Sequence, residues 1–141
     1  MRNPNALPFG LDEKELNRRL EQRLDDLAKK EKFYLRPDVS LKEISAKLYT
    51  NRTYASRMIN IIKGCKFNEY VNNLRLEKTA ELLQTKNYMN THSIHDLATD
   101  CGFASVSTFR RAFTKKYGTT PLSYAKKNGY RNKEAARKAK A

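Results

Sequence analysis

The chain has 141 residues, with 29 lysines and arginines against 15 aspartates and glutamates, which gives a formal charge of +14. No apolar run is long enough to cross a membrane, and the first residues lack the apolar segment of a signal peptide, so the composition excludes a membrane-spanning helix. The excess of positive charge predicts a polyanionic partner, with nucleic acid favoured over an anionic membrane surface.

The N-terminal part is predicted to be a linker followed by one amphipathic helix. Residues 1–10 hold two prolines and a glycine, a composition typical of a linker or a frayed end. From Leu11 to about Lys32, apolar residues recur at helical spacing among charges. The predicted stripe consists of Leu16, Leu20, Leu24 and Leu27. Packing of this stripe on the domain behind it is favoured over a coiled-coil dimer, because the segment holds too few heptads for a stable seam.

Two short helices are predicted next. Ser40 and Glu43 form a capping-box pattern that begins a helix over residues 41–48. Asn51 is a favourable N-cap for a helix over residues 52–63. The predicted inner residues of the pair are Leu41, Ile44, Ser45, Leu48, Ala55, Met58, Ile59 and Ile62. The spacing of these residues places one apolar face on each helix.

A longer helix is predicted over residues 67–84, and a polar loop follows it over residues 87–92. The candidate inner residues of the long helix are Phe67, Tyr70, Val71, Leu74, Leu82 and Leu83. Its length distinguishes it from the short helices on either side.

The stretch from Ser93 to Tyr124 is the most informative part of the sequence. Ser93 and Asp96 resemble a capping box that begins a helix over residues 94–101. Gly102 stands where the chain must turn with a positive φ, which glycine adopts without steric cost. One face of the following helix carries Phe109, Ala112, Phe113 and Lys116 or Tyr117. Two short helices joined by a glycine-containing turn, the second with a basic outer face, are typical of a helix-turn-helix that reads DNA.

The C-terminal end is predicted to be a short helix and a tail. Thr120 and Pro121 are a cap and a first helical residue, and the helix is expected to stop near Asn128. Residues 130–141 are basic, and a solvated run of charge is the default interpretation of such a tail.

The two short helix pairs are an internal repeat with two conspicuous differences. Tyr49 stands in the first turn where Gly102 stands in the second, which predicts either a different turn or a strained one. Ala55 occupies the inner position that Phe109 occupies in the second pair. The first core is therefore predicted to be the thinner of the two.

The motif residues lie at spacings found in a known family. They are Ile94, Leu97, Ala98, Gly102, Phe103, Ser107, Phe109, Arg111, Phe113, Gly118, Thr120, Pro121 and Tyr124. Through them the chain resembles the AraC/XylS family of bacterial transcription regulators, and the resemblance extends upstream to about Leu35. It implies an all-α fold with two helix-turn-helix subdomains, about 41–63 and 94–117. A linker helix of about 67–84 would join them, behind the N-terminal amphipathic helix, in one DNA-binding domain over 11–141.

The resemblance also implies which side chains meet DNA. The candidate base contacts are Arg52, Thr53, Ser56, Arg57, Val106, Ser107, Arg110 and Arg111. The candidate phosphate contacts are Lys63, Lys66, Lys115 and Lys116. Arginine can hold guanine O6 and N7 bidentately, whereas Val106 can only touch a thymine methyl. Arg57 and Arg111 are equivalent in the repeat, so both are predicted to read guanine, with a phosphate contact as the alternative for each.

The implied function is a sequence-specific regulator of transcription that binds double-stranded DNA, most often as an activator with RNA polymerase as a further partner. One monomer is expected to place both recognition helices in successive major grooves, about 34 Å apart. The chain has no room for the family's effector domain, so it is expected to be the output part of a longer sensor or receiver-domain regulator, or a small stand-alone member. A non-specific architectural protein is the alternative, since it would carry the same charge.

Catalysis is not predicted. Cys65 and Cys101 have the spacing of neither a metal site nor a disulfide framework, which fits a reducing cytoplasm and no cofactor. Cys101 falls on an inward helix position and is expected to be an inert buried thiol, while His95 faces outward. The clustered reactive cysteines of a DNA-repair methyl acceptor are missing from the sequence.

Overall fold

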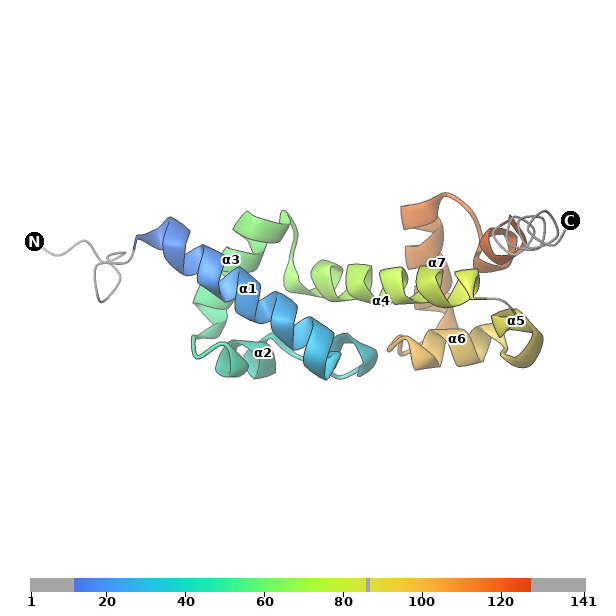
Figure 1. The fold of residues 1–141 in the computed structure, drawn as a ribbon, viewed down its shortest axis with the longest axis horizontal. Coiled ribbons are helices and arrows are strands. Elements are labelled where there is room, and N and C mark those ends of the chain that lie inside the picture. The colour runs from blue at the N-terminus through green and yellow to red at the C-terminus, as the bar shows by residue number, and fades with distance from the viewer. Residues whose placement is uncertain (1–11, 86, 128–141) are drawn as a thin grey trace, which may run out of the picture. The chain divides into compact units, whose positions relative to one another are not determined.

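The computed structural model describes residues 12–85 and 87–127, and every regular element in those ranges is a helix (Figure 1). The predicted N-terminal linker, the end of the last helix and the basic tail lie outside the described residues. The chain forms two compact units. The first contains the residues up to Phe33 and Asp38–Tyr70, and the second contains Tyr34–Pro37 and the residues from Val71 onward. None of the described helices is both long and apolar enough to span a membrane.

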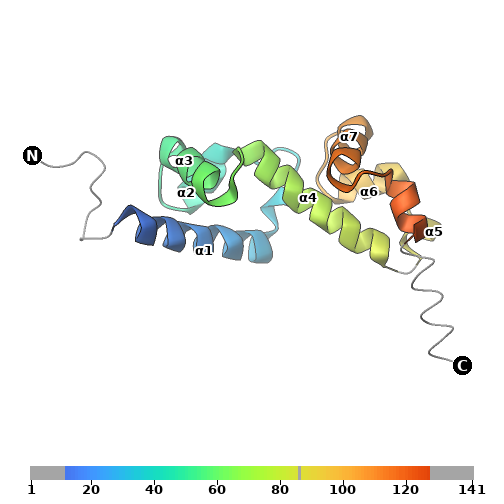
Figure 2. The same ribbon diagram turned by 90° about the horizontal axis from the view of Figure 1, so that it is seen from above.

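In the first unit, helix α1 (Glu13–Glu31) lies alongside helices α2 and α3, as Figures 1 and 2 both show. It begins at Asp12, whose side chain accepts a hydrogen bond from the Glu15 amide, and it ends at Lys32 with a φ of 48°. Its buried residues are Asn17, Leu20, Leu24 and Ala28. The predicted stripe was therefore right at its centre, whereas Leu16 and Leu27 are only half-buried.

The helix pair of the first unit consists of α2 (Leu41–Lys47) and α3 (Arg52–Lys63). The side chain of Ser40 accepts from the Glu43 amide, and the side chain of Asn51 accepts from the Tyr54 amide. Since these caps are local, the sequence located both helix starts correctly. The core of the pair consists of Ile44, Ser45, Leu48, Ala55, Met58 and Ile59. A 3₁₀ turn (Phe33–Leu35) that buries Phe33 precedes the pair.

Helix α4 (Phe67–Gln84) is one unbroken helix (Figure 2). Its buried residues are Phe67, Tyr70, Val71, Arg75, Leu76, Thr79, Ala80 and Leu83, while the predicted Leu74 and Leu82 are half-buried. The buried positions do not follow one stripe because the helix up to Tyr70 belongs to the first unit and the remainder to the second. A search for one apolar face therefore missed half of its core.

A short helix α5 (Tyr88–Thr91) occupies the segment predicted to be a polar loop. Asn87 precedes it with a φ of 72°, and the His92 amide donates to the Tyr88 carbonyl at 3.1 Å. The rings of Tyr88 and His92 stack with their centres 4.1 Å apart. One turn stabilised by a stacked ring pair leaves no helical period in the sequence, so the prediction of a loop was wrong here.

The second helix pair consists of α6 (Ile94–Asp100) and α7 (Val106–Tyr117), followed by helical residues 121–127. The predicted capping box is complete, because Asp96 N donates to Ser93 Oγ at 3.0 Å and Ser93 N donates to Asp96 Oδ2 at 2.9 Å. The core of this unit includes Leu76, Leu83, Leu97, Ala98, Cys101, Phe103, Phe109 and Phe113. The predicted all-helical fold with two helix-turn-helix subdomains is thus confirmed.

Candidate nucleic-acid interface

Helix α7 presents a polar face opposite its aromatic one. Phe109 and Phe113 are fully buried, and their rings meet edge-to-face with centres 5.8 Å apart. The helix begins at Ser105, whose Oγ accepts from the Thr108 amide. The candidate base contacts on α7 are Ser107, Arg110 and Arg111, which are exposed, and Val106, which is half-buried. Burial of the aromatic face therefore fixes which side chains α7 can offer to a partner.

Helix α3 presents a similar face in the first unit. Arg52, Thr53 and Arg57 are exposed, and Ser56 is half-buried. The other side of α3 is tied to α1, since the Tyr54 hydroxyl donates to Asn17 Oδ1 at 3.1 Å. The eight candidate base contacts thus lie on two equivalent helices, one in each unit, as the sequence predicted.

The arginines on these two faces are not in salt bridges with the described carboxylates. Arg52, Arg57, Arg110 and Arg111 form no salt bridge with a described residue, whereas Arg18 on α1 pairs with Glu15 at 2.9 Å. An exposed guanidinium without a carboxylate keeps its full capacity for bidentate binding of a guanine or a phosphate.

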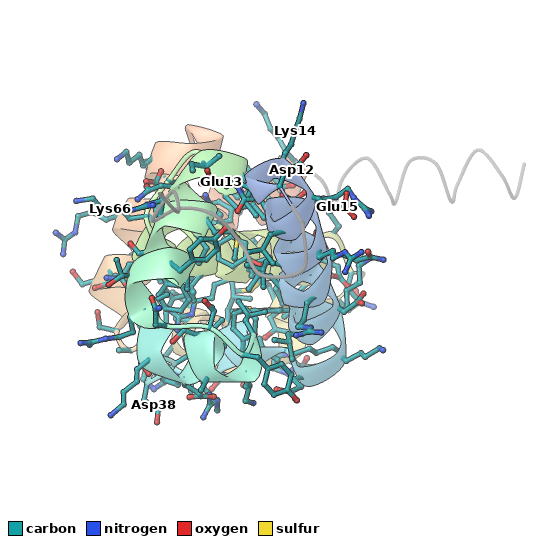
Figure 3. All side chains as sticks on the ribbon, turned by 90° about the vertical axis from the view of Figure 1, so that its left-hand side faces the viewer. Asp12, Glu13, Lys14, Glu15, Asp38 and Lys66 are labelled. Atoms are coloured by element: carbon teal, nitrogen blue, oxygen red, sulfur yellow. The ribbon has the colours of Figure 1, made fainter. Side chains whose placement is uncertain are left out.

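The four lysines predicted to contact phosphate fall into two groups. Lys66 and Lys115 are exposed and form no salt bridge with a described residue. The side chain of Lys66 points away from the ribbon (Figure 3). Lys63 has a side chain only 24% exposed, and its Nζ lies 3.0 Å from Asp25 and 3.6 Å from a second carboxylate on α1. Lys116 Nζ lies 3.8 Å from a carboxylate of α4. These pairs leave no local pattern in the sequence, because their partners are distant along the chain.

Both turns that precede the recognition helices place a residue at a positive φ, but only the second has a glycine there. Gly102 has a φ of 91°, as predicted. Tyr49 also has a positive φ, of 58°, and its side chain is 86% exposed with the ring 5.1 Å from the guanidinium carbon of Arg23. The first turn is therefore the strained alternative that the sequence left open, since a bulky residue rarely adopts this conformation.

The cysteine and histidine side chains do not form a reactive site. Cys101 is fully buried, and burial raises the pKa of its thiol to about 12, so the nucleophilic thiolate is suppressed at neutral pH. His95 is exposed on the outside of α6. Within the part of the chain that the structure describes, no group of three or more histidine, cysteine or acidic side chains could hold a metal ion.

A family model for a helix-turn-helix domain matches residues 44–127, which is more than half of the chain. Among curated proteins, the probable transcription factor PqrA of Proteus vulgaris is 35% identical over 91 residues, which are 64% of this chain and 70% of that protein. Other curated relatives, which include regulatory proteins, are matched over only 25–30% of their length.

Solved structures resemble the chain over most of its length. The C-terminal domain of AraT, a response regulator from Geobacillus stearothermophilus, has a TM-score of 0.62 at 28% identity, covering 79% of this chain and 84% of that one. A transcriptional regulator with an AraC-type DNA-binding domain from Chromobacterium violaceum has a TM-score of 0.67 at 20% identity, covering 79% and 93%. At 20% identity, the match to the Chromobacterium violaceum protein shows a similar fold and no more.

Proposed function

Since the chain belongs to the AraC family of helix-turn-helix transcription regulators, which are DNA-binding proteins and not enzymes, we propose that it reads a specific DNA sequence with α3 and α7. The observation that carries this proposal is the matched pair of exposed arginine-bearing faces, one on each recognition helix. A merely basic protein needs no such pairing, because phosphate attraction does not depend on where the charges lie relative to base edges.

The sharpest part of the proposal is that Arg57 and Arg111 each grip a guanine. The two residues are equivalent in the repeat, both are exposed, and neither has a described acidic partner. Arg111 lies one turn after Ser107, in the N-terminal half of α7. In a helix-turn-helix, the N-terminal residues of the recognition helix contact base edges in the major groove. Each bidentate pair contributes about 1–3 kcal/mol of discrimination against a wrong base.

The remaining base contacts follow the exposed sides of the same helices. Ser107 and Thr53 supply hydroxyl groups that can bond to any base edge, and half-buried Val106 supplies apolar contact for a thymine methyl. Ser56, Arg52 and Arg110 complete the eight residues in the proposed interface.

Phosphate contacts are proposed to come first from Lys66 and Lys115. Both are exposed, and neither forms a salt bridge with a described residue. Lys63 and Lys116 must exchange a carboxylate for a phosphate, so their contribution is expected to be smaller. In every case the contact is sequence-independent and weakens with salt, because it releases counterions from DNA.

The proposed arrangement is insertion of the two recognition helices into successive major grooves. Helix α4 has 18 residues and is about 27 Å long, whereas successive grooves lie about 34 Å apart. Some bending of the DNA is therefore expected, at about 1–6 kcal/mol depending on sequence, and it would add indirect readout to the base contacts.

The chain is further proposed to be the output domain of a longer activator that contacts RNA polymerase and acts in the cytoplasm. The short matched share of several curated relatives supports a longer protein, and the AraT likeness supports a receiver domain as one of its parts. A non-specific architectural protein is the runner-up, favoured only by the charge of +14.

Selection of bound sequences from a random duplex pool tests the proposal. The chain is expected to enrich one site and to bind it at least about 10³-fold more tightly than scrambled DNA. Equal affinity for selected and scrambled duplexes would instead favour the architectural protein. Footprinting of the selected site should show two protected segments about one helical turn apart.

A further inference from the structure

Arg75, on α4, is a buried arginine held by main-chain carbonyl groups. It is 9% exposed, and its Nε donates to the carbonyl oxygen of Tyr34 at 2.7 Å. Its Nη2 donates to the carbonyl of Arg36 at 2.8 Å and its Nη1 to Asn72 Oδ1 at 3.0 Å. No described carboxylate forms a salt bridge with it. Burial lowers the pKa of Arg75 from its usual value, yet a guanidinium stays charged in proteins.

The carbonyl that Arg75 binds also lies against the turn of the second helix-turn-helix. A Cβ on Gly102 would lie 2.2 Å from the Tyr34 oxygen and 2.9 Å from the main chain of Leu35. The guanidinium carbon lies 5.8 Å from the centre of the Phe103 ring, in the residue after that glycine. One short stretch of main chain therefore contacts both the guanidinium and the turn.

We propose that Arg75 is a positioning residue for DNA reading by α7. The turn at Gly102 and Phe103 sets the direction in which α7 leaves α6, and the main chain around Tyr34 is the surface on which that turn rests. The Arg75 guanidinium holds this main chain in place with two hydrogen bonds, one to the Tyr34 carbonyl and one to the Arg36 carbonyl. The inference rests on the proposed function, since it concerns how accurately α7 meets a base.

Only arginine can fill this role among the cationic residues. The planar guanidinium presents several donors in a fixed geometry, which matches two carbonyl oxygens and an amide oxygen at once. A lysine ammonium is a point charge on a flexible stem and would not hold both carbonyls in place. Arg75→Lys therefore keeps the charge and most of the side-chain volume, but it removes the planar group whose donors bind both carbonyls.

The test compares two variants of the second unit, Arg75→Lys and Leu83→Ala, on the selected DNA site. Leu83 is buried in the core of this unit, so its truncation weakens the fold without touching the main chain that Arg75 holds. Both are measured at a temperature where circular dichroism shows full helicity. The base pairs read by α7 are defined beforehand as those whose preference Arg111→Ala relaxes, and those read by α3 as those that Arg57→Ala relaxes.

Arg75→Lys is expected to lower affinity for the selected site about tenfold, as the loss of one bidentate base contact does. It should flatten the preference at the α7 base pairs and leave that at the α3 base pairs unchanged, while Leu83→Ala should keep both preferences. Arg75→Lys with the same base preferences as Leu83→Ala would overturn the inference. Failure of the wild-type chain to prefer its selected site would instead overturn the proposed function.

A pair of glycine substitutions tests the same contact should Arg75→Lys not fold. Gly102 and Gly118 both have a positive φ, of 91° and 70°, but a Cβ on Gly118 meets nothing within 4 Å. Both alanine variants carry the backbone strain, and only Gly102→Ala pushes on the Tyr34 carbonyl. Gly102→Ala is expected to flatten the α7 preference, and Gly118→Ala to keep it. Identical preferences in the two variants would overturn the inference.

Discussion

The two helix-turn-helix units have equivalent helices, but different contacts hold the recognition helix of each unit in place. Each recognition helix begins at a side-chain cap, Asn51 or Ser105, and ends at a glycine, Gly64 or Gly118, with φ near 70°. The second unit fills its core with phenylalanine rings. In the first unit the position equivalent to Phe109 is Ala55, which is also fully buried.

The first unit compensates through α1. The Tyr54 hydroxyl bonds to Asn17, and Lys63 pairs with Asp25, so both ends of α3 are tied to that helix by polar contacts. Equivalent recognition helices can thus be held either by an aromatic core or by a neighbouring helix. On the outward faces, Thr53 and Arg57 correspond in kind to Ser107 and Arg111, whereas Arg52 and Ser56 correspond to Val106 and Arg110.

Phe109→Ala should produce the largest loss of stability, because the ring is fully buried among other aromatic rings. The expected cost is about 3–5 kcal/mol in the free energy of unfolding, measured by urea denaturation. The matched change at the equivalent position is Ala55→Gly, expected to cost about 1 kcal/mol. Equal costs for the two would mean that the aromatic core does not support the second unit.

Arg111→Ala should come next and acts on binding instead of stability. Its removal is expected to cost about 1–3 kcal/mol on the selected site and to relax the preference at one base pair. Arg57→Ala should do the same at a different base pair if the outward faces are truly equivalent. Lys116→Ala is the control, expected to weaken all sequences alike. If Arg111→Ala lowers affinity for selected and scrambled duplexes equally, Arg111 is a phosphate clamp.

Lys66 forms no salt bridge with a described residue, whereas Lys63 in the same unit is paired, so the two lysines can be compared. Lys66→Ala should reduce the slope of log affinity against log salt by about one, as loss of one phosphate contact does. Lys63→Ala should change that slope less, because Asp25 and Glu21 already neutralise the ammonium. Titration of both variants on one duplex gives the comparison. Equal reductions would show that Lys63 leaves its acidic partners when DNA binds.

Local signals in the sequence predicted the helices, whereas distant partners escaped prediction. The caps at Ser93 and Asn51 located helix starts because each involves residues three apart. The glycine at position 102 predicted a positive φ. It did not predict that the carbonyl oxygen of Tyr34 would lie where a Cβ at this position would be. Arg75 was not among the predicted inner residues of α4, and its carbonyl partners are 39 and 41 residues away. Period and capping carry no information about such contacts.

Tyr49→Asn should give the smallest effect, and it tests whether the first turn is strained. A non-glycine residue held at a positive φ costs about 1–3 kcal/mol, and asparagine tolerates this conformation better than tyrosine does. The substitution also removes the contact between the Tyr49 ring and Arg23, which at an exposed site contributes about 0.5–1 kcal/mol. The net gain in unfolding free energy is therefore expected to be only a few tenths of a kcal/mol.

The Arg23→Ala background separates the strain from the ring contact. With the guanidinium absent, Tyr49→Asn no longer loses a cation–π contact, so the gain should rise to about 1 kcal/mol. Urea denaturation of the four chains of this double-mutant cycle measures the difference. A loss of stability in the Arg23→Ala background would contradict the argument, because it would mean that Tyr49 suits the first turn as well as glycine suits the second.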